Sequence, residues 1–207
     1  MIDADADLVP DAKIVLALEF LQHTGSFKAR GAANLMVALV QARRMPAVGI
    51  VSATGGNADI GFAWAAQRLG IPATVFLDRS TPSARVERLR GLGADVHVAG
   101  ASKAEAQQVA RRFREHTGAI DAYTHDDILT SAGAGTILLE LAAACPMLDT
   151  VVCAVGAGGM FSGIAAVADS LGIRLVRAEL EGSQALHTAL AARAIPTSTP
   201  RAGMPAS

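Results

Sequence analysis

The stretch LQHTGSFKARGA, residues 21–32, places a single lysine among small and polar residues, between an apolar segment and a helical pattern. A lysine on a solvated helix face needs no such surroundings. A lysine that acts as a nucleophile must be held still and kept partly neutral. The only other lysines, Lys13 and Lys103, lie outside loops of glycine and serine. The stretch therefore makes Lys28 the first candidate for a reactive group.

On both sides of this stretch, short runs rich in β-branched residues alternate with longer helical patterns. We expect strands at residues 13–20, 47–53, 73–78, 94–99, 150–156 and 173–180. We expect helices at residues 27–44, 58–70, 81–93, 102–118, 130–145, 158–172 and 182–192. This alternation predicts an α/β fold with parallel strands and helices on both faces of the sheet. Ser102 and Glu105 have the spacing of a capping box at a helix start.

Composition narrows the classes of protein and partner. The chain has 207 residues, of which 51% are hydrophobic, so it can bury a sizeable core. Its net charge of -1 predicts no nucleic-acid partner, and no apolar run is long enough to predict a membrane span. The acidic first residues do not have the pattern of a signal peptide, and Cys145 and Cys153 have no metal-ligand or disulfide-framework spacing. We therefore expect a cytoplasmic protein.

Two more loops of small residues follow expected strands. In VVCAVGAGGMFSGI, residues 151–164, glycines precede a helix whose first N–H groups can bind a phosphate; close packing of a plain turn is the alternative. A dinucleotide loop partnered by Glu179 is a weaker reading, because the spacing departs from GxGxxG. In SATGGNADIG, residues 52–61, Asn57 stands at a helix start, where it could equally be a cap.

The three loops together predict one ligand site, because ligands of open α/β sheets bind at the carboxyl ends of the strands. One loop offers an amine, one an asparagine and one a set of backbone N–H groups. These groups match the aldehyde, ring hydroxyl and phosphate of pyridoxal 5'-phosphate (PLP).

The same motifs resemble those of a known family, the fold type II PLP-dependent enzymes (tryptophan synthase β-like), in the threonine/serine dehydratase and serine racemase branch. QHTGSFKARGA resembles the family's cofactor-lysine motif. SATGGNADIG is similar to its SAGNHAQG motif, and AVGAGGMFSGI is similar to its PVGGGGLISGI loop. The resemblance runs from about residue 13 to residue 190, with all motifs in order.

This resemblance implies roles for individual residues. Lys28 is the catalytic residue and binds the cofactor covalently, and Asn57 faces the ring hydroxyl. The phosphate lies among Gly156, Ala157, Gly158, Gly159 and Met160. Thr54, Gly55 and Gly56 bind the substrate. No metal site is expected, because the position that would complete one with Glu179 is Ala185. The expected role of Glu179 is a solvated charge or the cap of a helix.

The resemblance also implies an arrangement of domains and partners. A small domain, residues 41–126, is inserted into a large PLP domain formed by residues 1–40 and 127–207. Relatives are longer at both ends, so we expect a truncated large domain and weak or absent activity of the 207-residue chain. The complete family fold is a homodimer that binds a small amino-acid substrate and PLP, without nucleic acid or membrane.

The expected reaction is β-elimination of threonine or serine to a 2-oxo acid and ammonia. Racemisation is expected to be minor, because the serine that acts opposite the lysine in similar racemases is replaced here by Gly55. Thr54 could take that role only if the loop is shifted by its extra residue. The alternatives are a non-catalytic remnant of the fold, a threonine synthase and a β-replacing sulfhydrylase.

Overall fold

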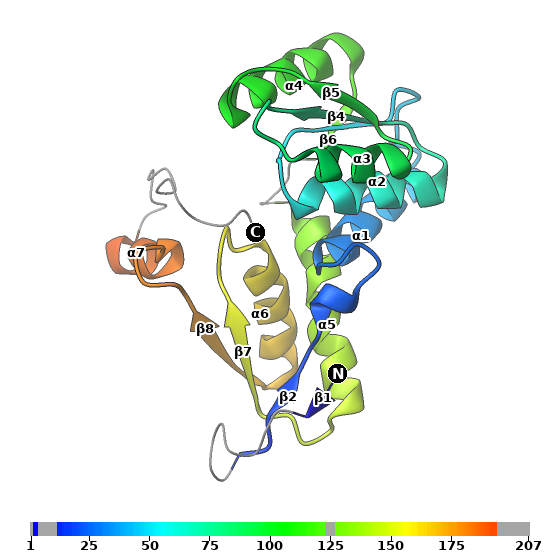
Figure 1. The fold of residues 1–207 in the computed structure, drawn as a ribbon. Coiled ribbons are helices and arrows are strands. Elements are labelled where there is room, and N and C mark those ends of the chain that lie inside the picture. The colour runs from blue at the N-terminus through cyan, green and yellow to red at the C-terminus, as the bar shows by residue number, and fades with distance from the viewer. Residues whose placement is uncertain (1, 4–11, 123–126, 194–207) are drawn as a thin grey trace.

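The structure of the chain is a computed structural model that describes residues 2–3, 12–122 and 127–193. Two parallel sheets, each covered by helices, lie at opposite ends of the described molecule, and long helices pack between them (Figure 1). The expected α/β class with parallel strands is confirmed.

The larger sheet has four parallel strands in the order β5-β4-β3-β6. Its strands are β3 (Ile50–Ser52), β4 (Ala73–Leu77), β5 (Asp95–Val98) and β6 (Ile120–Asp121). The helices that connect them are α2 (Asn57–Leu69), α3 (Ser83–Gly91) and α4 (Lys103–Thr117). Helices α2 and α3 lie on one side of the sheet and α4 lies on the other (Figure 1). Both faces of β4 are therefore buried, which explains why Thr74 is its only polar residue.

Successive residues of these strands enter different cores. Val75 and Leu77 pack with the buried faces of α2, α3 and α1 (Lys28–Gln41). Val51 and Phe76 point to the other side and pack with α4. The expected parallel sheet with helices on both faces follows from this two-residue period.

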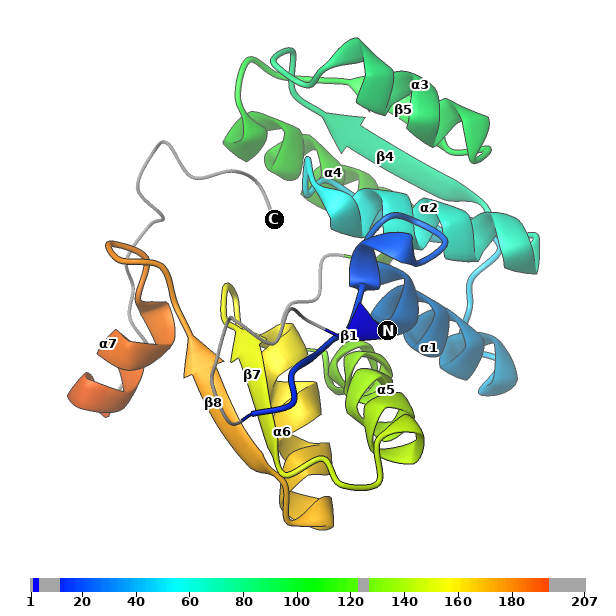
Figure 2. The same cartoon turned by 60° about the horizontal axis from the view of Figure 1, so that its bottom comes forward.

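The smaller sheet pairs β7 (Thr150–Ala154) in parallel with β8 (Arg174–Ala178). Helix α6 (Gly159–Leu171) connects the two strands and packs on β7, and α5 (Ile128–Ala144) packs along α6. The two helices lie side by side in Figure 1 and, after rotation, in Figure 2. Helix α7 (Ala185–Ala192) follows β8.

Four glycines allow three of these helices to approach closely. A Cβ on Gly133 of α5 would lie 2.7 Å from the Cα of Gly31 on α1, and a Cβ on Gly163 of α6 would overlap the Ser131 carbonyl oxygen. Gly135 faces α6 in the same way, because its Cβ would lie 2.7 Å from the Gly163 carbonyl oxygen. Helix α5 thus contacts α1 on one side and α6 on the other. This packing sets the separation of the first residues of α1 and α6.

The prediction for residues 13–20 is wrong. In place of one buried strand there is a two-residue strand, β2 (Val15–Leu16), paired antiparallel with β1 (Ile2–Asp3), and then a 3-10 helix, η2 (Glu19–Leu21). The Leu16 and Phe20 residues are 42% and 65% exposed, so this apolar run is not part of a core in the described structure. Strand β6 is an element that sequence patterning missed, because two residues are too few to display a period.

The capping predictions are largely confirmed. The Ser102 hydroxyl accepts a hydrogen bond from the Glu105 backbone N–H at 3.3 Å, while the Glu105 carboxylate accepts from Ala101 N–H rather than from Ser102. Glu179 caps α7, because its carboxylate accepts from the N–H groups of Leu186 and His187 at 2.8 and 2.9 Å. Asn57, in contrast, is not a cap: it is the first residue of α2, and Gly56 occupies the N-cap position.

Within the described residues, no helix is both long and apolar enough to cross a bilayer. No group of three or more His, Cys, Asp or Glu residues in this part of the chain has the arrangement of a metal site.

Candidate active site

A pocket lies between the first turns of α1, α2, α5 and α6. Its lining combines an amine, a hydroxyl, a helix N-terminus and apolar side chains. The lining residues are Phe27, Lys28, Gly31, Thr54, Ala58, Phe62, Ala122, Thr130, Ala134, Gly159 and Met160. These residues come from four separate sequence regions, so the pocket exists only in the folded chain.

Lys28 is the first residue of α1 and reaches the pocket with its amine 4.9 Å from the centroid of the Phe27 ring. Burial lowers the pKa of the Lys28 amine below its ordinary value, because desolvation disfavours the charged form. Helix α2 fits against the same backbone, since a Cβ on Gly61 would lie 3.1 Å from the Lys28 carbonyl oxygen. The backbone of Lys28 is therefore held in place, and its amine loses a proton more readily than the amine of an exposed lysine does.

We expect Lys28 to titrate below the ordinary pKa of a lysine in the cofactor-free protein. The folded chain releases the Lys28 proton at a pH where the unfolded chain still holds it. Between the folded and unfolded pKa values the unfolded chain binds more protons, so the contribution of Lys28 to the free energy of unfolding rises with pH. Reductive methylation with peptide mapping across a pH series measures the pKa of the Lys28 amine in the folded and in the unfolded chain. Equal pKa values in the two states would contradict the burial argument.

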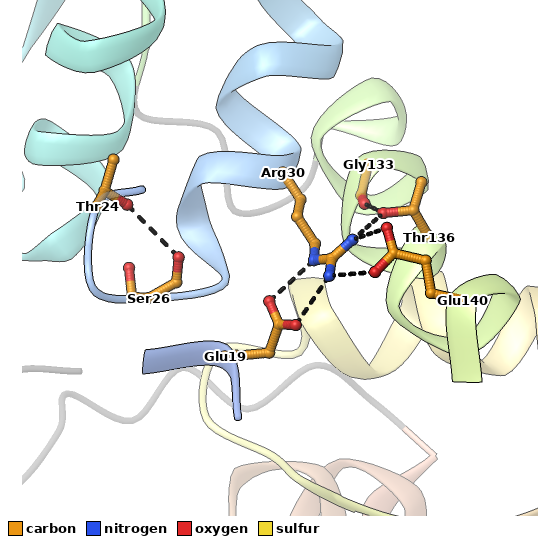
Figure 3. Close-up of polar contacts among 7 residues, drawn as sticks. All are labelled: Glu19, Thr24, Ser26, Arg30, Gly133, Thr136 and Glu140. Carbon is orange, nitrogen blue, oxygen red and sulfur yellow. Dashed lines mark hydrogen bonds and ion pairs between the residues drawn. The ribbon is translucent and has the colours of Figure 1, made fainter. Parts of the chain in front are cut away.

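Arg30, two residues after Lys28, fixes the start of α1 against two other elements (Figure 3). Its guanidinium forms ion pairs with Glu19 of η2 at 2.9 Å and with Glu140 of α5 at 2.7 Å, and it also donates to Thr136 Oγ1 at 3.0 Å. The Arg30 side chain is only 10% exposed. Hydrogen bonds that Arg30 donates to Glu140 and Glu19 raise the pKa of Arg30, and Arg30 in turn lowers the pKa of Glu140. Arg30 thus holds the helix that carries Lys28 in one orientation.

The segment before Lys28, residues 22–27, is here called the lysine loop. Its turn is closed by the Gly25 N–H, which donates to the Gln22 carbonyl oxygen at 2.8 Å, and Gly25 has a φ of 71° that favours glycine. The buried Thr24 hydroxyl donates to the Ser26 carbonyl oxygen at 3.4 Å (Figure 3). His23 stacks on Trp64 of α2 with a centroid separation of 5.0 Å. The loop is therefore attached to α2 as well as to α1.

The segment before α2, residues 53–57, is here called the asparagine loop. The fully buried Asp59 restrains this loop through its Oδ1 atom. That oxygen accepts one hydrogen bond from the Ser52 hydroxyl and another, of 2.9 Å, from the Thr54 N–H. The Thr54 hydroxyl accepts from the Gly56 N–H at 3.1 Å. Gly55 has a φ of 67°, which strains any other residue. Asp59 thus determines where Thr54 lies in the pocket wall.

The glycine loop, residues 156–160, leads from β7 into α6. Gly158 is the N-cap with a φ of 92°, and Gly159 begins the helix. A Cβ on Gly156 or Gly158 would meet no other atom within 4 Å, so the loop has open space around it. The first N–H groups of a helix lack intrahelical acceptors and carry partial positive charge. Gly159 and Met160 bring this helix end to the pocket.

The structure gathers four of the residues named by sequence reasoning in one pocket: Lys28, Thr54, Gly159 and Met160. The other named residues lie next to the pocket in sequence but outside its lining: Gly55, Gly56, Asn57, Gly156, Ala157 and Gly158. Ala58 contributes to the lining where Asn57 was expected to.

Sequence reasoning missed several residues of the site. Asp59 had a detectable signal, because it is a lone carboxylate in the otherwise apolar helix ADIGFAWAA. No sequence signal pointed to Arg30, Arg85 or Arg88, because each binds a residue that is distant in sequence. Their partners are Glu140, Gly55 and Thr24, respectively.

The residues of the pocket fit PLP. An amine whose pKa is lowered by burial stands in the same cavity as a helix N-terminus, which matches the separate needs of an aldehyde and a phosphate. Apolar side chains of Phe27, Phe62 and Met160 offer the contact surface for an aromatic ring.

Comparison with known proteins agrees with this fit. Residues 6–206 match the family model described as pyridoxal-phosphate dependent enzyme. An L-threonine ammonia-lyase of Thermotoga maritima is 40% identical over 163 residues, which are 79% of this chain and 40% of that protein. The structure of maize serine racemase superposes with a TM-score of 0.80 at 33% identity, covering 87% of this chain and 55% of the racemase. The structure of a processed threonine deaminase of Solanum lycopersicum also superposes with a TM-score of 0.80. It is 29% identical, and the match covers 86% of this chain and 49% of the deaminase.

The chain therefore spans about half the length of the relatives that it matches. Within that span the motifs, the fold and the pocket all agree with the match, and the chain belongs to the family of pyridoxal-phosphate-dependent enzymes.

Proposed function

We propose that this chain binds PLP between Lys28 and the start of α6, and that the protein converts threonine or serine to a 2-oxo acid and ammonia by β-elimination. The observation that carries the proposal is the pocket that holds the Lys28 amine, whose pKa is lowered by burial, and the α6 N-terminus together. In this proposal residues 41–126 form a small domain beside a large domain formed by residues 1–40 and 127–207, and the complete protein is a homodimer.

Lys28 has two roles in the proposed reaction. Its amine would hold the cofactor through the aldehyde, and Lys28 would take up the proton of the substrate α-carbon once substrate is bound. Bound PLP supplies an electron-withdrawing ring that accepts the negative charge of that carbon. Burial favours the neutral amine that both roles require.

Backbone groups bind the charged ends of the ligands in this proposal. The N–H groups of the glycine loop receive the phosphate, and Asn57 faces the ring hydroxyl. Thr54, Gly55 and Gly56 receive the substrate carboxylate, with Asp59 keeping Thr54 in position through the hydrogen bond at 2.9 Å. The β-hydroxyl leaves with a proton as water, and addition of water then releases ammonia and the 2-oxo acid.

Racemisation is the second candidate, and one observation favours it. Thr54 lines the same pocket as Lys28, so a residue with a hydroxyl group borders the pocket beside Gly55, which has no side chain. That hydroxyl already accepts a hydrogen bond from the Gly56 N–H, which restricts its role as a second proton carrier. Elimination therefore remains the proposed main reaction.

We expect the PLP-loaded chain, incubated with L-threonine or L-serine, to show at most weak turnover, in which ammonia and 2-oxobutanoate or pyruvate form in equal amounts. Chromatography on a chiral column should find D-serine well below pyruvate. D-serine in amounts comparable to pyruvate would make the protein a racemase. Bound PLP without any product would indicate a non-catalytic member of the family, and products only with an added second nucleophile would indicate a β-replacing enzyme.

A further inference from the structure

We infer that Arg85 and Arg88 of α3 are positioning residues that together hold the lysine loop and the asparagine loop at a fixed separation. Neither arginine lines the pocket. Their importance for PLP rests on the proposed function, because these two loops lead to Lys28 and Asn57. The contacts themselves belong to the cofactor-free chain and can be tested without it.

Arg88 holds the lysine loop. Its Nη2 donates a hydrogen bond of 3.0 Å to the carbonyl oxygen of Thr24, a residue that is almost fully buried. This carbonyl immediately precedes Gly25, where the loop turns. A bond at this position restrains the segment that leads into Lys28.

Arg85 holds the asparagine loop. Its Nη1 donates to the carbonyl oxygen of Gly55, and the side chain is partly buried between α3 and the loop. Asp59 binds the same loop through the Thr54 N–H. The peptide groups between Thr54 and Gly56 are therefore restrained by α2 through a carboxylate and by α3 through a guanidinium.

The two arginines act from one rigid element. Residues three positions apart on a helix are neighbours on its surface, so Arg85 and Arg88 extend from the same face of α3. A guanidinium is planar and donates in fixed directions, which makes it suited to defining a distance. Helix α3 thus links two loops that are about 30 residues apart in sequence. Small displacements of reacting groups have large effects on rates, so a fixed loop separation matters for chemistry at Lys28.

Amide hydrogen exchange of the cofactor-free chain tests the restraint directly. In Arg88→Met we expect roughly tenfold faster exchange in the lysine loop, the change produced by loss of one hydrogen bond from a charged donor. Arg85→Met should accelerate amide hydrogen exchange in the asparagine loop by a similar factor. Methionine keeps an apolar stem of similar reach. Arg90→Met is the matched control, because Arg90 is exposed on the same helix and its side chain makes no hydrogen bond to another described residue.

A second readout connects the restraint to cofactor chemistry. We expect slower covalent capture of added PLP, followed by absorbance, in Arg85→Met and Arg88→Met than in Arg90→Met, at equal thermal midpoints. Arg88→Lys, which keeps one charged donor, should restore part of the rate. Failure of the proposed function would be distinguishable, because PLP capture would then be absent in every variant while the exchange differences persist. Exchange that is unchanged in both loops, or that rises equally throughout the chain, would overturn the inference.

Discussion

Replacing Lys28 with methionine is expected to abolish covalent PLP binding and to lower elimination activity by on the order of a thousandfold or more. Lys28 is the lysine of the pocket, and burial already favours its neutral amine. Methionine has similar reach and no amine, so both the covalent bond to the cofactor and the base are removed. Absorbance of the purified variant with added PLP, together with a 2-oxo acid assay, measures the two effects.

The loss should not reflect unfolding. Removing a partly buried amine removes a desolvation cost, so we expect the thermal midpoint of the cofactor-free Lys28→Met chain to equal or exceed that of the parent. Lys103→Met is the matched control, because Lys103 begins α4 on the far side of the four-stranded sheet and should leave PLP binding unchanged. Normal covalent binding in the Lys28 variant would show that another group binds the cofactor.

Replacing Gly163 with alanine is expected to destabilise the chain by on the order of 3 kcal/mol, a fall in thermal midpoint of roughly 5–10 °C. The new Cβ would overlap the Ser131 carbonyl oxygen and lie 2.8 Å from the Gly135 nitrogen. Both are backbone atoms of α5, so neither can move away by a rotamer change. Helices α5 and α6 must separate, and thermal unfolding followed by circular dichroism measures the cost.

Gly91→Ala is the control for this prediction. Gly91 ends α3, and a Cβ there would meet no atom within 4 Å. Alanine has the higher helix propensity, so we expect a change of less than about 1 kcal/mol in the stabilising direction. If Gly163→Ala is as stable as Gly91→Ala, the close approach of α5 and α6 does not exist as described.

Patterns local in sequence predicted most of the fold. Apolar runs such as residues 73–77 and the helical stretch of residues 57–69 correspond to β4 and α2. The failures have physical causes. A run of apolar residues such as residues 13–20 has no period that separates a strand from an irregular segment. Gly56 and not Asn57 is the N-cap of α2, because the helix begins one residue earlier than expected, and local sequence does not fix a helix boundary to one residue.

The parts of the site that could be predicted are those that a short stretch of sequence identifies. A lysine among glycine and serine residues and a glycine loop before a helix are recognisable, and the structure brings Lys28 and Gly159 to one pocket. The contacts of Asp59, Arg85 and Arg88 depend on which elements meet in space, and no local pattern encodes that. The small residues of α5 carried a signal of close packing whose partners only the fold identifies.

Borohydride reduction of the PLP-treated chain, followed by digestion and mass mapping of peptides, tests the central claim most directly. Reduction makes the bond between cofactor and amine permanent, so the labelled residue can be identified. The account predicts one label, on Lys28, and loss of that label in Lys28→Met. A label on Lys103 or Lys13, or no label with excess PLP, would contradict it.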